Sequence, residues 1–288
     1  MEKISFYKMS GAGNDFIFID KNLSPDFVPN QDIIRKLCDR RNGIGADGVI
    51  TVTNSSIYDF DMEYFNADGS TGSLCGNGAR CAIKFADLSG KLKNRSAKFL
   101  SNNVPYSGEV LGENEIKFNF NPPVKLKYNF KIKAFGQLIN ACFADTGSPH
   151  VIIKIEDVLK ESKNPNLSYT DLNEFPVFEL GREIRYHSDF APGGTNVNFI
   201  KINEGKIFIR TYERGVENET LACGTGSTAA AVIAYSTDKI NPPISLITRG
   251  GDELIVNFDF QNQKIEGLSL TGPAKVTFTG EFPLNKFN

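Results

Sequence analysis

The chain has 288 residues, which suggests two domains or one large domain at roughly 100 to 200 residues each. Hydrophobic residues make up 40% and charged residues 23%, which indicates a sizeable core and argues against global disorder. The net charge of −2 provides no basic field for a nucleic-acid partner. No apolar run is long enough to span a membrane, and the first residues hold no apolar signal segment, so a cytoplasmic location is expected.

Short apolar or alternating segments recur along the chain and predict strands. In chain order, strands are expected at residues 4–8, 16–19, 48–53, 61–65, 116–120, 151–155, 198–202, 206–212, 253–258 and 274–279. Apolar residues at helical spacing predict helices at 31–40, 77–89 and 225–236. The polar, turn-rich stretch 161–174 is expected to form a surface loop.

A faint internal repeat divides the chain into two similar halves. The sequence Leu-Cys-Gly-Asn-Gly at 74–78 resembles Ala-Cys-Gly-Thr-Gly at 222–226, and residues 43–50 align with 193–200. A unit of this length is too long for a solenoid, so the repeat predicts a duplicated α/β domain with a ligand cleft between its copies. The expected boundaries are 1–122, completed by 275–288, and 123–274.

Each repeated turn places a cysteine, Cys75 or Cys223, directly before a predicted helix. Glycines let the backbone approach a ligand, and the first amide N–H groups of a helix are unpaired and favour negative charge. A cysteine there is expected to have a pKa lowered towards neutrality, and the same amides can hold a carboxylate. Neither segment matches a phosphate-binding loop of the G-x-x-x-x-G-K-[ST] or G-x-G-x-x-G type.

Two such turns, facing each other, predict inversion at a carbon next to a carboxylate. One thiolate would remove the α-proton from one face while the opposite thiol delivers a proton to the other, and the helix N-termini would stabilise the charge that builds on the carboxylate.

Cys38, Cys81 and Cys142 are expected in the core. The chain has two histidines and no C-x-x-C spacing, which argues against a Cys/His metal site.

Several motifs in a fixed order make a family resemblance specific. They are residues 10–16 (SGAGNDF), 41–48 (RNGIGADG), 65–70 (FNADGS) leading into 74–81, 146–150 (TGSPH), 194–199 (GTNVNF), and 212–215 (YERG) leading into 223–226. Over essentially its whole length the chain resembles the diaminopimelate epimerases. The resemblance implies an α/β (α+β) fold of two similar domains, related by a pseudo-twofold axis, each a mixed β-barrel-like sheet curled around a central helix.

The resemblance also implies the activity and the site. It implies a homodimer that interconverts LL- and meso-2,6-diaminopimelate in lysine biosynthesis without any cofactor, pyridoxal phosphate included. Cys75 and Cys223 would be the acid–base pair, supported by His150 and Glu213. The substrate contacts would be Asn14, Asn66, Gly76, Asn77, Asn196, Glu213, Arg214, Gly224 and Thr225. One departure is Ser148, where many family members carry Asn, which leaves its contact with the distal end of the substrate open.

Two other interpretations remain open at this point. A proline racemase-like enzyme, or another isomerase of the same architecture such as a phenazine-pathway isomerase, would keep the two cysteines and change the substrate. The resemblance implies that proline-type relatives have His where Asn77 stands and lack the pair Glu213 and Arg214, which a second amino-acid end would need, so these residues favour diaminopimelate. The third interpretation is a non-catalytic amino-acid-binding protein, or a redox-responsive one with Cys75 and Cys223 as a disulfide switch.

Overall fold

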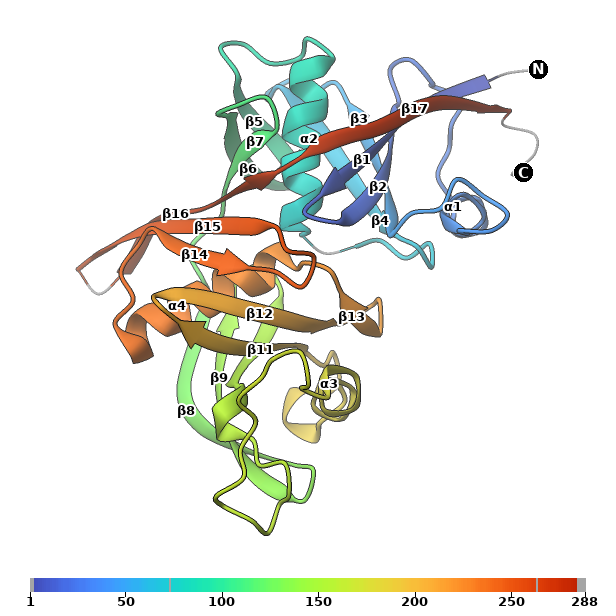
Figure 1. Ribbon diagram of the computed structural model, residues 1–288. Helices are drawn as coiled ribbons and strands as arrows, with labels where there is room; N and C mark the ends of the chain where they lie inside the picture. Colours follow the sequence, from blue (N-terminus) through green and yellow to red (C-terminus); the bar gives the residue numbers. More distant parts are fainter. Residues whose placement is uncertain (1–2, 73, 263, 284–288) are drawn as a thin grey trace. The chain divides into compact units, whose positions relative to one another are not determined.

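The computed structural model describes residues 3–72, 74–262 and 264–283, which form two compact units (Figure 1). Unit 1 comprises Met1–Asn119 and Thr271–Asn288, and unit 2 comprises Phe120–Leu270. The chain is a mixed α+β protein dominated by strands. Within the described ranges, no helix is both long enough and apolar enough to cross a membrane.

In the part of the chain that the structure describes, unit 1 holds eight strands and two helices. The strands are β1 (Lys3–Gly11), β2 (Asn14–Asp20), β3 (Gly48–Thr53), β4 (Phe60–Asn66), β5 (Ser96–Ser101), β6 (Val104–Val110), β7 (Glu115–Asn119) and β17 (Lys275–Pro283). The helices are α1 (Gln31–Cys38) and α2 (Gly76–Leu88). The C-terminal strand β17 returns to pair antiparallel with β1, so the end of the chain completes the first unit (Figure 1).

Unit 2 contains the remaining described elements, and among these only the end of β16 extends into unit 1. The strands are β8 (Lys125–Ala134), β9 (Gln137–Asp145), β10 (Pro149–Lys154), β11 (Asn196–Asn203), β12 (Lys206–Glu213), β13 (Asn218–Thr220), β14 (Ile244–Ile247), β15 (Glu253–Gln261) and β16 (Lys264–Pro273). The helices are α3 (Val177–Arg185) and α4 (Gly224–Asp238), with 3-10 turns at Ile155–Asp157 and Ser188–Phe190.

The two units share one order of strand pairing. In unit 1, β1–β2 is antiparallel, β2–β3 parallel, β3–β4 antiparallel and β4–β5 parallel. In unit 2, β9–β10, β10–β11, β11–β12 and β12–β14 repeat that order. A parallel pair needs a crossover, and α1 and α2 lie in the two crossovers of unit 1 as α3 and α4 do in those of unit 2. The internal repeat is therefore a repeat of topology.

One helix in each unit is buried on all sides. Every residue of α2 from Gly76 to Ala86 is buried, and so is every residue of α4 from Gly224 to Ala234. Helix α2 packs against β1, β2, β3, β4, β6 and β7, and α4 against β9, β10, β11, β12, β14 and β15. A helix buried all round belongs to the core of its domain, so the expected sheet around a central helix is confirmed in each unit.

Candidate active site

In unit 1, Cys75 is the N-cap residue of the central helix α2. Its backbone is extended, with φ −113° and ψ 108°, and its Sγ accepts a hydrogen bond from the Gly78 amide at 3.4 Å. The helix-start amides thus stabilise negative charge on this sulfur. The sequence-predicted residues Gly76 and Asn77 are the first two residues of the helix.

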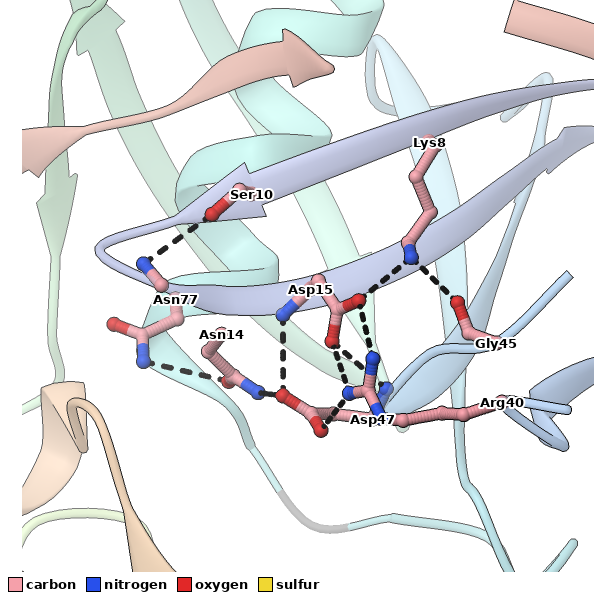
Figure 2. Close-up of polar contacts among 9 residues, drawn as sticks. Lys8, Ser10, Asn14, Asp15, Arg40, Gly45, Asp47 and Asn77 are labelled. Carbon is pink, nitrogen blue, oxygen red and sulfur yellow. Dashed lines mark hydrogen bonds and ion pairs between the residues drawn. The ribbon is translucent and has the colours of Figure 1, made fainter. Parts of the chain in front are cut away.

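The Asn14 side chain lies against this sulfur, and the Asn77 side chain contacts Asn14. Figure 2 shows the contact between the two asparagines. Cys75 Sγ lies 3.6 Å from Asn14 Oδ1, and Asn77 Nδ2 donates to the same oxygen at 3.4 Å. Asn77 Oδ1 accepts from Arg80 Nη2 at 2.9 Å, and Arg80 is fully buried one turn along α2. The structure therefore brings together Asn14, Asn77 and Cys75, which the sequence analysis had named separately.

Behind Asn14 lies a cluster of ion pairs that fixes its other end (Figure 2). Asn14 Nδ2 donates to Asp47 Oδ2 at 2.5 Å. The Arg40 guanidinium bridges two carboxylates, at 2.7 Å from Asp15 Oδ1 and 2.7 Å from Asp47 Oδ1. Lys8 Nζ is 2.6 Å from Asp15 Oδ2. The parallel pairing of β2 with β3 sets Asp47, just before β3, beside the start of β2.

Burial raises, and neighbouring cationic side chains lower, the pKa values of the Asp15 and Asp47 carboxyl groups. Burial alone would raise the pKa of Asp15, but hydrogen bonds from Arg40 and Lys8 outweigh it and lower that pKa to about 2. Burial, with the Asp15 charge beside it, raises the pKa of Asp47. The ion pairs of Asp15 therefore stabilise the folded state only while Asp15 is ionised.

This difference predicts an acid-dependent loss of stability that depends on Asp15. Because its folded pKa of about 2 is below the usual 3.8, its contribution is present above about pH 4 and lost as the pH falls towards 2. Such a shift corresponds to roughly 2 kcal/mol. Urea unfolding at pH 5 and pH 2 is expected to show a fall in unfolding free energy about 2 kcal/mol smaller for Asp15→Asn than for the wild type. An equal fall in the two proteins would contradict this account.

In unit 2, Cys223 is the N-cap residue of α4 and is buried. Its backbone is extended, with φ −125° and ψ 111°, as at Cys75. Cys223 Sγ lies 3.5 Å from Thr225 Oγ1, and a methyl group built on Gly226 would lie 3.3 Å from the same sulfur. The sequence-predicted residues Gly224 and Thr225 are the first two residues of α4, equivalent to Gly76 and Asn77.

A fully buried histidine lies next to Thr225. His150 Nε2 is 2.9 Å from Thr225 Oγ1 and 2.9 Å from Ser148 Oγ, and His150 Nδ1 is 3.1 Å from Asn198 Nδ2. Burial, reinforced by the charge of Arg214, lowers the pKa of His150 to about 3 although the Asn198 contact raises it. The ring is therefore neutral at neutral pH and carries a single N–H.

Asn196, Glu213 and Arg214 lie at neighbouring ends of β11 and β12. Asn196 Nδ2 donates to the Pro149 carbonyl at 2.9 Å, and Asn196 Oδ1 accepts from the Arg214 amide at 2.9 Å. Glu213 Oε2 accepts from the Thr220 hydroxyl at 2.8 Å. Arg214 lines a cavity of about 670 Å³ in unit 2. These contacts bring three of the predicted polar residues into one corner of the unit.

Asn66 is held by its own turn. It ends β4, its Nδ2 donates to Ser70 Oγ at 3.0 Å, and its backbone pairs with Gly48. Ser70 in turn donates to Asp68 Oδ1 at 2.6 Å, which lowers the pKa of Asp68. The turn therefore fixes the side chain at the carboxyl end of β4, where the equivalent β12 of unit 2 ends in Glu213.

Several further residues of the two networks were not named as site residues from the sequence: Lys8, Asp15, Arg40, Asp47, Arg80 and Asn198. Of these, Asp15, Asp47, Arg80 and Asn198 lie within the motifs at 10–16, 41–48, 74–81 and 194–199. The remaining cysteines, Cys38, Cys81 and Cys142, are buried as predicted. Within the described ranges, no group of three His, Cys, Asp or Glu side chains is arranged to bind a metal ion.

Comparison with known proteins identifies a family across the length of the chain. The family model for diaminopimelate epimerase matches residues 6–126 and 142–277. The diaminopimelate epimerase of Aquifex aeolicus is 37% identical, with 96% of this chain and 97% of the relative covered. The diaminopimelate epimerase of Chlorobaculum tepidum is 38% identical, with 96% of this chain and 100% of the relative covered.

A solved structure shares the fold at much lower sequence identity. It is a probable proline racemase from Agrobacterium radiobacter with bound carbonate, 13% identical, with a TM-score of 0.71. The match covers 99% of this chain and 94% of that one. At this identity the likeness establishes the fold, and the substrate has to be argued from the residues.

Proposed function

The chain belongs to the diaminopimelate epimerase family, and we propose that it inverts one α-carbon of diaminopimelate with Cys75 and Cys223 as the acid–base pair. The observation that carries this proposal is the equivalence of the two cysteines. Each is the extended N-cap residue of the buried central helix of its unit, followed by Gly-x-Gly. A two-base inversion requires two such groups because one group cannot reach both faces of a carbon.

The first amides of α2 and α4 suit the reacting carboxylate. When the α-proton leaves, negative charge spreads onto that carboxylate, and N–H groups already pointing at it lower the barrier. Gly76 and Asn77 supply such amides in unit 1, and Gly224 and Thr225 supply them in unit 2. Helix N-termini bind carboxylates readily. Because their oriented N–H groups also stabilise the charge that develops on the carboxylate, they make the α-proton acidic enough for a sulfur base.

The chemical step conserves atoms and charge. A cysteine thiolate on one face takes the α-proton and becomes a thiol, while the electron pair of the C–H bond moves towards the carboxylate. The thiol of the other cysteine then protonates the α-carbon from the opposite face and becomes a thiolate. The product has the inverted configuration, and the enzyme is left with its two sulfurs in exchanged protonation states.

The polar residues of unit 2 fit the distal amino-acid end of this substrate. Arg214 offers a planar pair of donors to a carboxylate, and Glu213 offers an acceptor to an ammonium group. Asn196 holds the Arg214 backbone in place through its Oδ1. We include Asn14 and Asn66 among the substrate contacts as well, because their amides can both donate and accept.

We assign His150 a positioning role in this proposal. A neutral, fully buried imidazole does not exchange protons with the substrate, but it fixes the hydroxyl of Thr225 beside Cys223. Glu213 is assigned to the ammonium group of the substrate.

The proposal also includes the features implied by the family resemblance: a homodimer, a step in lysine biosynthesis, a cytoplasmic location, and activity without pyridoxal phosphate.

The proposal predicts that the purified, fully reduced protein converts LL-diaminopimelate to the meso isomer. Chiral chromatography of the product measures this conversion, and dialysis against a carbonyl reagent that removes pyridoxal phosphate is expected to leave the rate unchanged. Proline serves as the competing substrate, because the shared fold with a proline racemase is the strongest rival. Faster racemisation of proline than of diaminopimelate would overturn the choice of substrate while keeping the two-cysteine chemistry.

A further inference from the structure

The side chains around the two cysteines differ in hydrogen-bond polarity, although the cysteines occupy equivalent positions. We infer that two hydrogen-bond networks, each oriented by side chains that do not touch the sulfur, present an acceptor to Cys75 and a donor to Cys223. The free enzyme therefore holds Cys75 as the thiol and Cys223 as the thiolate. This inference rests on the proposed function for its meaning in catalysis.

On the side of Cys75, two neighbours fix the orientation of the Asn14 amide. The Asp47 carboxylate accepts hydrogen bonds, so Asn14 must turn its Nδ2 towards it, at 2.5 Å. Asp47 is itself held by Arg40, 2.7 Å away, and by the Asp15 amide. With Nδ2 committed to Asp47 (Figure 2), the carbonyl oxygen Oδ1 must face the opposite way, and it lies against Cys75.

Arg80 fixes the same polarity from the other direction. Guanidinium groups only donate, so Asn77 must turn its Oδ1 towards Arg80 and its Nδ2 towards Asn14 Oδ1. The chain of donors and acceptors from Arg80 to Asp47 therefore has one consistent direction. Asn14 Oδ1 lies 3.6 Å from Cys75 Sγ, where it accepts from a thiol and repels a thiolate. It opposes the Gly78 amide, which favours the thiolate at 3.4 Å.

On the side of Cys223, the chain of hydrogen bonds runs the other way. Asn198 Nδ2 donates to the Val151 carbonyl at 2.9 Å, which identifies it as the amide nitrogen, and the same nitrogen is 3.1 Å from His150 Nδ1. Asn198 Oδ1 accepts from the Thr211 hydroxyl at 2.9 Å. Because Nδ1 accepts and the ring is neutral, the single N–H of His150 is on Nε2.

The Nε2–H of His150 points at two hydroxyl groups. Thr225 Oγ1 and Ser148 Oγ are each 2.9 Å from Nε2, and Ser148 Oγ donates to Thr225 Oγ1 at 3.3 Å. The Thr225 oxygen therefore receives hydrogen bonds from this side, and its own proton is directed to Cys223 Sγ at 3.5 Å. A donated hydroxyl stabilises a thiolate. Ser148 is part of this network.

Charged side chains that do not contact the sulfurs fix the orientation or the protonation state of the residues in the two networks. Arg80, Asp47 and Arg40 lie behind the contacts of Cys75, and Arg214 acts on His150 behind the contacts of Cys223. Asn198 and Asp47 are accordingly positioning residues, since each acts on a sulfur through another side chain. Asn198 acts through His150 and Thr225, and Asp47 acts through Asn14.

The test measures the pH dependence of alkylation at each cysteine of the free enzyme. The full chain, reduced, is treated with limiting iodoacetamide from pH 5 to pH 10, and peptide mass spectrometry gives a rate for each cysteine. The midpoint of each profile reports thiolate formation independently of how easily the reagent reaches the sulfur. We expect the Cys223 midpoint to lie at least about one pH unit below that of Cys75. Equal midpoints or the reverse order would overturn the inference.

Variants identify the groups responsible for this difference. Thr225→Val removes the hydroxyl and is expected to raise the Cys223 midpoint by about one unit, while Thr225→Ser restores it. Thr228→Val is the matched control, because this buried hydroxyl one turn along α4 donates to the Gly224 carbonyl. An unchanged Cys223 midpoint in Thr225→Val, or an equal shift in Thr228→Val, would contradict the network.

The acceptor side has its own pair of variants. Asp47→Asn frees the Asn14 amide to turn and is expected to lower the Cys75 midpoint. Asp15→Asn removes the same charge from the same cluster while leaving the contact between Asn14 and Asp47, so a smaller shift is expected. Equal shifts would leave only the lost charge as the cause and overturn the role of Asn14. Alkylation does not require turnover, so a failure of the proposed function remains distinguishable from a failure of this inference.

Discussion

Cys75→Ala and Cys223→Ala are each expected to abolish turnover of diaminopimelate in both directions. An inversion that uses one sulfur on each face stops when either sulfur is missing, and loss of a general acid or base costs up to about 10⁴-fold in rate. We expect a fall of at least about 10³-fold in kcat for each variant. Chiral chromatography of the products measures it, starting in turn from each isomer.

Cys142→Ala is the matched control for this experiment. Cys142 is buried in β9 and its Sγ accepts from the Asn129 amide at 3.5 Å, so its loss affects packing rather than chemistry. Activity close to that of the wild type is expected for Cys142→Ala, with a modest loss of stability. A variant lacking Cys75 or Cys223 that keeps more than about a tenth of the activity would contradict the acid–base assignment.

Gly226→Ala is expected to have the second-largest effect. A methyl group on Gly226 would overlap Asn198 Oδ1 and press on Cys223 Sγ, so Asn198 must move away from His150. Overpacking of this kind costs about 1–3 kcal/mol of stability. The displaced network is expected to lower kcat by about 100-fold, because small misplacements at a reacting centre have effects of this size. Urea unfolding and steady-state kinetics measure the two effects.

Gly78→Ala is the matched control, since Gly78 occupies the same position at the start of α2. There the added methyl group would lie 2.8 Å from Ile50 Cδ1, the flexible end of a side chain that can rotate, and 3.6 Å from Cys75 Sγ. The expected stability loss is below about 1 kcal/mol, offset in part by the better helix propensity of alanine. Equal losses in the two variants would contradict the role given to Asn198.

Local patterns predicted most of the elements that surround the site. Short apolar or alternating segments identified strands such as β3 and β12, and the glycine-rich turns after Cys75 and Cys223 marked the starts of α2 and α4. Strand β8 was missed because its apolar residues alternate with lysines on an exposed surface, although the period of two is present. Helix α3 was missed because it is only nine residues long and follows the predicted loop closely.

The network residues could not be deduced from local patterns because they meet through strand register. His150 reaches Asn198 because β10 and β11 pair in parallel, with His150 opposite Asn196. Asp47 reaches Asn14 because β2 and β3 pair in the same way. Such pairings join residues far apart in the sequence, so no short window contains both partners. The burial that keeps His150 neutral is likewise a property of the folded unit.

The proposed polarity has a consequence for the catalytic cycle. Each turnover leaves the two sulfurs with exchanged protonation states, so the enzyme must return to the form in which Cys223 is the thiolate. In that form the network around Thr225 stabilises the sulfur, and the Asn14 oxygen accepts from the Cys75 thiol. The free enzyme is therefore expected to be ready for one of the two isomers and to need a proton shift before it accepts the other.

Solvent deuterium tests the two-sulfur inversion most directly. The enzyme is incubated with LL-diaminopimelate in deuterated water, and the recovered substrate and the meso product are separated at low conversion for mass spectrometry. Protonation by a second sulfur on the opposite face predicts deuterium in nearly every product molecule and almost none in the recovered substrate. Deuterium in both pools to a similar extent would show that one exchanging base serves both faces, and would contradict the account.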